Sequence, residues 1–294
     1  MKEKGLIKTR LPRYKKAKTP PPMSLTDRDK RIVEAVYQFR FLTRDQIKQL
    51  EFEKGSMTAC QRRLSLLYHN GYLSAVLKAI PTGYGSSKRV YCLSKKGAAL
   101  IAHLYSEKEA REIKWNEKHN KVEPFFIEHT LAINDVRIAF SKAVLETKEY
   151  ELSWTNEQNV KAWKEKVDDP ENSGKTLPIT PDAFLYLTSK DKKAYYFLEV
   201  DRATESNHRW RDKIKGYVEY VKSGRYQERF KTSALRVLTI STSKERITNL
   251  IKTTQSVENA YFFLFATLDQ VKGNNIIFKP VWKTTGKEGL ISLL

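Results

Sequence analysis

Two apolar runs joined by a short polar segment, within residues 182–201, constrain the fold of this chain more than any other feature. The first run ends at Leu187, the second begins at Ala194, and residues 189–193 between them are polar. Short runs rich in aromatic and aliphatic residues, bounded by turn residues, are typical of β-strands. We therefore predict a β-hairpin whose turn is centred between positions 190 and 191.

Three carboxylates belong to this hairpin. Side chains alternate along a strand, so Glu199 and Asp201 project from one face, and the predicted turn places Asp182 opposite Glu199. Like charges this close require a bound cation or a shared proton, and Mg²⁺ takes carboxylate oxygens of this kind. The sequence thus predicts a catalytic, metal-binding cluster, with plain ion pairs to Arg202 or Lys213 as the alternative.

Strands and helices alternate in the second part of the chain. From a helix that begins at Phe125, the predicted order is α-β-β-β-α-β-α-β, and the last strand is Ile276–Trp282. This order predicts a mixed sheet flanked by helices. The helix after Asp201 carries Lys213, which could orient water or stabilise phosphate charge when a phosphodiester is attacked. A solvated helix face is the alternative for this lysine.

Positive charge is concentrated in the first third of the chain. Residues 1–105 hold 22 Lys and Arg against 7 Asp and Glu, whereas residues 106–294 hold 32 against 27. Such an excess at one end is typical of a module that binds a polyanion, and nucleic acid is the commonest partner of this kind.

Residues 24–105 have the pattern of a winged helix. Capping residues Thr26 and Thr43 begin two helices, a third spans about 57–70, two strands surround a glycine-rich tip, and a last helix spans 94–105. In such a module the third helix enters the major groove and the wing follows the backbone. Use of this module for protein contacts is the alternative. The candidate DNA contacts are Thr58, Gln61, Arg62 and Arg63 on the third helix, with Lys88 and Arg89 on the wing.

The flanking segments show no apolar periodicity. Residues 1–23 carry eight Lys or Arg, one Glu and three consecutive prolines, which predicts a flexible arm that either contacts phosphates or stays solvated. Residues 106–124 are polar and predict a linker. The expected α+β chain therefore consists of an arm (1–23), a winged helix-turn-helix domain (24–105), a linker (106–124) and an α/β domain (125–294).

Several of these residues together resemble the replication-relaxation family of plasmids and other mobile elements. The match consists of Pro181-Asp182, the block from Glu199 to Glu205 that reads E-x-D-R-x-T-E, and Lys213 with Tyr217 four residues later. This family is similar to MOBC-type plasmid relaxases, whose catalytic domain resembles PD-(D/E)xK nucleases. The resemblance implies a nuclease-like second domain and nicking at a transfer or replication origin.

The resemblance also implies roles for individual residues. Asp182 and Glu199 would bind Mg²⁺ or Mn²⁺, and Glu128 would be an additional ligand. Lys213 would replace the lysine that nucleases have two residues after the acid, where this chain has Asp201. The first hypothesis is therefore a relaxase-like nicking enzyme acting on double-stranded DNA at an origin or regulatory site. The alternative is a catalytically inactive replication, partition or transcription regulator that uses the second domain for oligomerisation, including a homodimer, or for partner binding.

Other classes are excluded by composition and motifs. Two cysteines cannot form a disulfide framework, and the longest apolar stretch, residues 260–268, is too short to span a bilayer; we therefore expect a cytoplasmic protein with no membrane partner. The chain has no His-hydrophobic-His motif of two-histidine relaxases and no phosphate-binding glycine loop.

Overall fold

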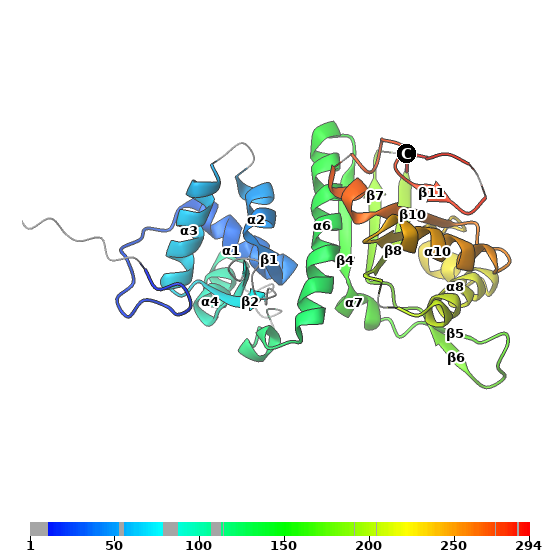
Figure 1. The fold of residues 1–294 in the computed structure, drawn as a ribbon, viewed down its shortest axis with the longest axis horizontal. Helices are drawn as coiled ribbons and strands as arrows, with labels where there is room; N and C mark the ends of the chain where they lie inside the picture. The colour runs from blue at the N-terminus through cyan, green and yellow to red at the C-terminus, as the bar shows by residue number, and fades with distance from the viewer. Residues whose placement is uncertain are drawn as a thin grey trace, which may run out of the picture. The chain divides into compact units, whose positions relative to one another are not determined.

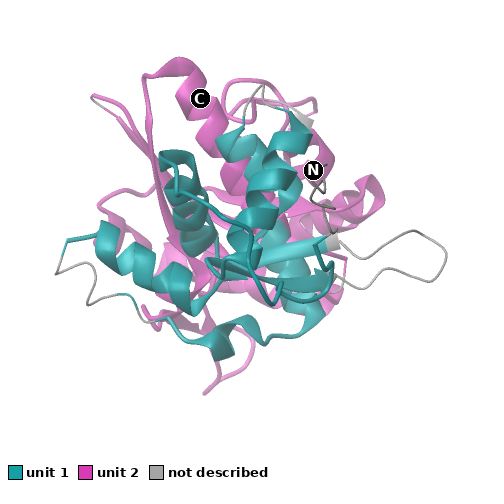
Figure 2. Cartoon of the chain, turned by 90° about the vertical axis from the view of Figure 1, so that its left-hand side faces the viewer, with its two compact units in different colours: residues 1–131 teal, residues 132–294 magenta. Residues whose placement is uncertain are grey.

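The chain forms two compact units, residues 1–131 and residues 132–294 (Figure 2). The computed structural model describes residues 11–52, 56–78, 88–106, 113, 115–190, 192–203, 205–273, 275–286 and 288–294 (Figure 1). Helix α6 (Pro124–Thr147) begins in the first unit and continues in the second. The predicted second domain begins at residue 125, whereas the second unit begins at Ala132.

The first unit combines helices with a small antiparallel sheet of strand order β1-β3-β2. Helices α1 and α2 each begin at the predicted capping residue, Thr26 or Thr43, with a reciprocal capping box. Strand β1 was not predicted, because three residues carry no alternation. The described elements of the first unit are α1 (Asp27–Phe39), β1 (Phe41–Thr43), α2 (Arg44–Glu51), α3 (Met57–His69), β2 (Leu73–Lys78), β3 (Lys88–Leu93), α4 (Lys95–Leu104) and the 3₁₀ helix η1 (Glu117–Asn120).

Residues 11–23 differ from the predicted flexible arm. The Ala17 N–H donates to Nδ1 of His69 at 3.0 Å, and the Asn70 side chain donates to the Pro21 carbonyl at 3.0 Å. This segment therefore lies against the end of α3. The glycine-rich hairpin tip lies outside the described residues.

In the first turn of α4, the backbone at Gly97 lies close to the backbone of Tyr72. Gly97 is buried, and a Cβ at this position would overlap the carbonyl oxygen of Tyr72 and lie 2.9 Å from Cδ1 of Leu93. A side chain there forces the helix away from the chain that leads into β2.

We expect Gly97→Ala to destabilise the protein by about 1–3 kcal/mol through overpacking, despite the better helix propensity of alanine. Urea unfolding followed by far-UV circular dichroism measures the change. Lys95→Ala, at an exposed site on the same helix, is the control and should shift the midpoint very little. An equal midpoint for the two variants would contradict the overlap.

The second unit contains a six-stranded mixed sheet of order β11-β10-β9-β8-β7-β4. Strands β8, β9 and β10 are parallel, and the other neighbouring pairs are antiparallel. This confirms the predicted α+β chain with a mixed sheet. The elements are β4 (Glu151–Asn156), α7 (Glu157–Lys161), β5 (Lys166–Asp168), β6 (Thr176–Pro178), β7 (Ala183–Thr188), β8 (Lys193–Asp201), α8 (Asn207–Lys222), α9 (Arg225–Phe230), β9 (Val237–Ser241), α10 (Lys244–Gln255), β10 (Phe263–Thr267), α11 (Leu268–Gly273) and β11 (Lys283–Thr284).

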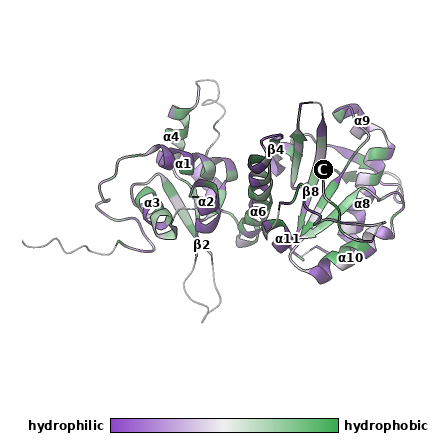
Figure 3. Ribbon diagram, turned by 90° about the horizontal axis from the view of Figure 1, so that it is seen from above, coloured by the Kyte–Doolittle hydropathy of each residue, from purple (hydrophilic) through white to green (hydrophobic). Residues whose placement is uncertain are grey.

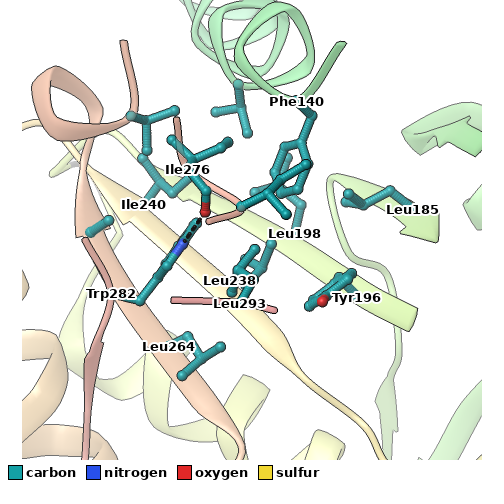
Figure 4. Packing of buried hydrophobic residues seen from close by; sticks show 14 of the residues in the cluster. Phe140, Leu185, Tyr196, Leu198, Leu238, Ile240, Leu264, Ile276, Trp282 and Leu293 are labelled. Atoms are coloured by element: carbon teal, nitrogen blue, oxygen red, sulfur yellow. Dashed lines mark hydrogen bonds between the residues drawn. The ribbon is translucent and has the colours of Figure 1, made fainter. Parts of the chain in front are cut away.

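Apolar side chains cover both faces of this sheet, and the central strands are strongly hydrophobic (Figure 3). Phe140 of α6 packs on one face with Leu198 and Leu238 (Figure 4). The opposite face packs against α8 and α10 through residues such as Phe197 and Trp210. Glu199 and Asp201 share the parity of Phe197 along β8, so this second face carries the predicted acids.

The predicted last strand, Ile276–Trp282, is wrong. Its apolar side chains belong to the core on the α6 face of the sheet, with Phe278 only partly buried, but the segment is a loop. Asn275 Oδ1 accepts from the backbone N–H groups of Ile277 and Phe278, and the Trp282 indole donates to the Ile276 carbonyl at 2.8 Å (Figure 4). A buried loop and a buried strand have the same apolar composition, which misled the prediction.

The hairpin register agrees with the prediction. Ala183 pairs with Leu198 and Thr188 with Lys193, so the pairing is symmetric about the predicted centre. The Asp182 N–H donates to the Leu198 carbonyl at 2.9 Å. Asp182 therefore lies just beyond the Ala183–Leu198 pair, beside the part of β8 that carries Glu199. No helix in the described part of the chain is long and apolar enough to cross a membrane.

Candidate functional site

Glu199 is the centre of the candidate site. This residue is only 2% exposed, and both of its carboxylate oxygens have protein donors. Lys213 Nζ donates to Oε2 at 2.8 Å, and the Tyr217 hydroxyl donates to Oε1 at 2.5 Å. Lys213 and Tyr217 are one turn apart on α8, so a single helix face supplies both donors.

Burial decides the protonation chemistry of this group. It raises the pKa of Glu199 to about 7, because desolvation and the nearby Asp182 outweigh the attraction of Lys213 and the two hydrogen bonds. Burial lowers the pKa of Lys213, but Glu199, Asp182 and Glu205 together raise it above its ordinary range. Lys213 is therefore a permanent cation at neutral pH, and the charge that changes near neutrality is that of Glu199.

Lys213 gathers the acids of this site. Its Nζ lies 3.2 Å from Oε1 of Glu205 as well as 2.8 Å from Glu199. Asp182 joins this group through charge, and its Oδ2 also accepts from the Val200 N–H at 2.7 Å. The ammonium thus lies among carboxylates from the start of β7, the end of β8 and the loop before α8.

Asp201 has a different cation. Its Oδ2 accepts from the Arg246 guanidinium, and its Oδ1 accepts from the Ala203 N–H at 3.1 Å. Arg246 also donates to Asn207 Oδ1 at 3.0 Å and to the Glu205 carbonyl at 2.6 Å. The three predicted acids therefore do not share one cation: Lys213 serves Glu199 and Arg246 serves Asp201. Within the described residues, no group of three or more His, Cys, Asp and Glu could hold a metal ion.

Sequence reasoning missed Arg246 and the ion pair of Glu205 with Lys213. Asp201 pairs with Ser241 in the parallel β8–β9 ladder, and α10 begins three residues after Ser241. In a parallel pair, the carboxyl ends of the two strands lie at the same edge of the sheet. A cation in the first turn of α10 could therefore have been predicted to lie near Asp201.

The DNA-contact candidates lie in the first unit. Thr58, Gln61 and Arg62 are exposed on α3, as the helical pattern predicts. Arg63 instead forms a two-point ion pair with buried Asp29 of α1, in which Nε donates to Oδ1 at 2.9 Å. Their contact with DNA stays a prediction.

The remaining candidates have mixed positions. The Arg89 guanidinium lies over the Tyr68 ring, 4.7 Å from its centroid, and donates to the Arg13 carbonyl. Lys88 begins β3, but its side chain lies outside the described residues. Glu128 lies on α6 within the first unit, whereas Asp182 and Glu199 belong to the second, so its ligand role stays a prediction.

The fold and the site define an α+β protein in which a central mixed sheet presents a buried glutamate to a lysine and a tyrosine. The replication-relaxation family matches residues 33–234, more than half of the sequence, and the chain belongs to this family. The matched region contains Asp182, Glu199, Lys213 and Tyr217 and ends before Arg246. Membership in this family points to a role in replication or mobilisation.

The chain was also compared with solved structures and with curated proteins. The restriction endonuclease FokI is similar over 85% of this chain and 45% of its own, with a TM-score of 0.30 and 10% sequence identity, so the chain spans less than half the length of that protein. No curated protein matches the sequence.

Proposed function

We propose that this protein binds double-stranded DNA at an origin or regulatory site of a plasmid or other mobile element and nicks it with Mg²⁺ or Mn²⁺, as a relaxase does. One observation carries the catalytic part: Asp182, just before β7, lies close enough to Glu199 of β8 to raise its pKa, and the Lys213 ammonium is 2.8 Å from Glu199. A pair of acids with an adjacent lysine is what metal-dependent attack on a phosphodiester uses. The family relationship supports the biological setting.

The first unit is the proposed DNA-recognition module, a winged helix-turn-helix. Support comes from the order of its helices, from the three-stranded antiparallel sheet and from the exposed polar face of α3 with Thr58, Gln61 and Arg62. In this proposal α3 enters the major groove, and Arg89 contacts phosphates without reading sequence.

The two carboxylates Asp182 and Glu199 are too few for a site in which the protein supplies every metal ligand, but they suit Mg²⁺. Mg²⁺ keeps several waters and commonly binds one or two carboxylates together with substrate phosphates. Asp182 and Glu199 would hold it, and the ion would polarise a phosphoryl oxygen. Lys213 already has carboxylate partners and would balance phosphate charge at the same place.

The test is nicking of a supercoiled plasmid that carries the element's own origin region, with and without Mg²⁺ or Mn²⁺. We expect metal-dependent open circles with the wild type and their loss with Glu199→Gln, because the neutral amide removes a metal ligand while keeping the size of the side chain and one oxygen that can accept from Lys213. Glu258→Gln, an exposed acid on the same unit, is the matched control and should nick normally. Nicking by Glu199→Gln at the wild-type rate would refute this role of the glutamate.

A second function is favoured by the ion pairs themselves. Lys213 already pairs with Glu199, which a metal would bind, and Arg246 pairs with the neighbouring Asp201. The second unit would then be a catalytically inactive platform for oligomerisation, a homodimer included, or for partner binding, in a replication, partition or transcription regulator. Site-selective DNA binding with intact supercoils for both wild type and Glu199→Gln would support this function.

A further inference from the structure

Residues 11–23, here called the basic strap, are held on the first unit at regular intervals. The Arg13 carbonyl accepts from Arg89 of β3, the Ala17 N–H donates to His69 at 3.0 Å, and the Pro21 carbonyl accepts from Asn70 at 3.0 Å. These anchors recur every four residues and use the backbone of the strap. These three anchors do not use the side chains of Lys15, Lys16 and Lys18.

Four of the exposed side chains of the strap are cationic. Arg13, Lys15, Lys16 and Lys18 are all exposed, and residues 11–23 contain no Asp or Glu. Lys16 lies 5.9 Å from the Tyr68 ring centroid at the end of α3. The backbone anchors thus fix a line of positive charges beside the helix that the proposed function places in the major groove.

The positive surface continues onto α4. Lys16 lines a hollow of about 510 Å³ together with Lys95 and Lys96, and Glu117 is the acid among its lining residues. The first turn of α4 carries these two lysines and no acid. Cations at a helix N-terminus are disfavoured by the helix dipole, and a nearby anion offsets this cost.

We propose that the basic strap binds the phosphate backbone of double-stranded DNA as a fixed, sequence-independent contact surface beside α3. This inference rests on the proposed function, because it requires that the first unit binds DNA. Each phosphate contact releases condensed counterions and adds to the salt dependence of binding. Because the strap is anchored before DNA arrives, little additional order has to be imposed on it.

The charge on the strap is tested with Lys15→Gln/Lys16→Gln/Lys18→Gln in the full-length chain. Duplex affinity is measured by fluorescence anisotropy from low to moderate salt, on the origin sequence and on a scrambled sequence. We expect the slope of log affinity against log salt to become shallower by roughly 2–3, at about 0.9 per lost phosphate contact. The ratio of specific to non-specific affinity should not change, because phosphate contacts carry no sequence information.

Two control variants show whether the position and the charge matter. Lys252→Gln/Lys279→Gln/Lys283→Gln removes the same charge from exposed sites of the second unit and should leave the slope close to that of the wild type. Lys15→Arg/Lys16→Arg/Lys18→Arg keeps the charge and should keep the slope. An unchanged slope in the glutamine strap variant, with a wild type that binds duplex normally, overturns this inference alone. A wild type that binds no duplex at low salt overturns the proposed DNA binding itself.

The anchoring is tested with Ala17→Pro, which removes the N–H donor to His69 without changing any charge. We expect affinity to fall roughly 2- to 10-fold, because the released strap must then be ordered by the DNA. The salt slope should stay at the wild-type value. Wild-type affinity in this variant would show that the anchors do not contribute.

Discussion

Replacement of Arg63 by alanine is expected to destabilise the protein by about 3 kcal/mol. The guanidinium binds both oxygens of Asp29, whose side chain is 0% exposed, and the alanine would leave this carboxylate buried without its cation. Removing one partner of a buried ion pair typically costs about 3–5 kcal/mol, and we take the lower end because the Arg63 side chain is 25% exposed.

The measurement is urea unfolding of the full-length chain followed by far-UV circular dichroism. Tryptophan fluorescence is less suitable, because four of the five tryptophans lie in the second unit. Arg62→Ala removes an exposed arginine from the neighbouring position of α3 and should change stability by less than about 0.5 kcal/mol. Equal unfolding midpoints for Arg62→Ala and Arg63→Ala would show that the ion pair with Asp29 is not structural.

The ion pair between Arg63 and Asp29 could not be predicted from the sequence. The helical spacing correctly placed Arg62 and Gln61 outward, and the capping pattern correctly gave Asp29 a role at the start of α1. Nothing local indicated that Arg63 reaches across to α1, because the two residues are 34 positions apart. Local signals define helices and their ends, whereas the partner of a long side chain depends on how the helices pack.

The hairpin in the second unit was more predictable. A short symmetric turn fixes the register of both strands, so the pairing of β7 with β8, which brings Asp182 near Glu199, followed from counting residues. The partner of Asp201 did not follow, because Arg246 comes close only when β8 and β9 pair in parallel. The sequence therefore predicted one cluster of three carboxylates, whereas the structure pairs Asp201 with a separate guanidinium.

Replacement of Glu199 by glutamine is expected to remove a large pH dependence of stability. The pKa of Glu199 is about 7 in the folded protein, against an ordinary value of 4.5. Between these values the unfolded chain has already released a proton that the folded protein keeps. Wild-type stability should therefore fall as the pH rises from 4.5 to about 7. At about 1.4 kcal/mol per pKa unit, the total loss is roughly 3 kcal/mol.

Glutamine resembles the protonated acid, so Glu199→Gln should not show this loss. Its amide can still accept from Lys213, which also keeps Glu205 at 3.2 Å. We expect the variant and the wild type to have similar stability near pH 4.5, and the variant to be more stable by roughly 3 kcal/mol at pH 8. Urea unfolding at several pH values measures this difference, with Glu258→Gln as the control. Parallel stability curves for Glu199→Gln and the wild type would contradict the raised pKa.

This pH dependence bears directly on the proposed chemistry. A metal binds the ionised carboxylate, so nicking by the wild type should increase as the pH rises through about 7, over the range in which the pKa of Glu199 makes the folded protein less stable. Ionisation of the buried Glu199 makes the folded protein less stable. A strongly shifted pKa of this kind is typical of residues at functional sites. In a catalytically inactive domain, no gain in activity would offset this loss of folding stability. A stability gain in Glu199→Gln without any wild-type nicking would therefore favour the regulator.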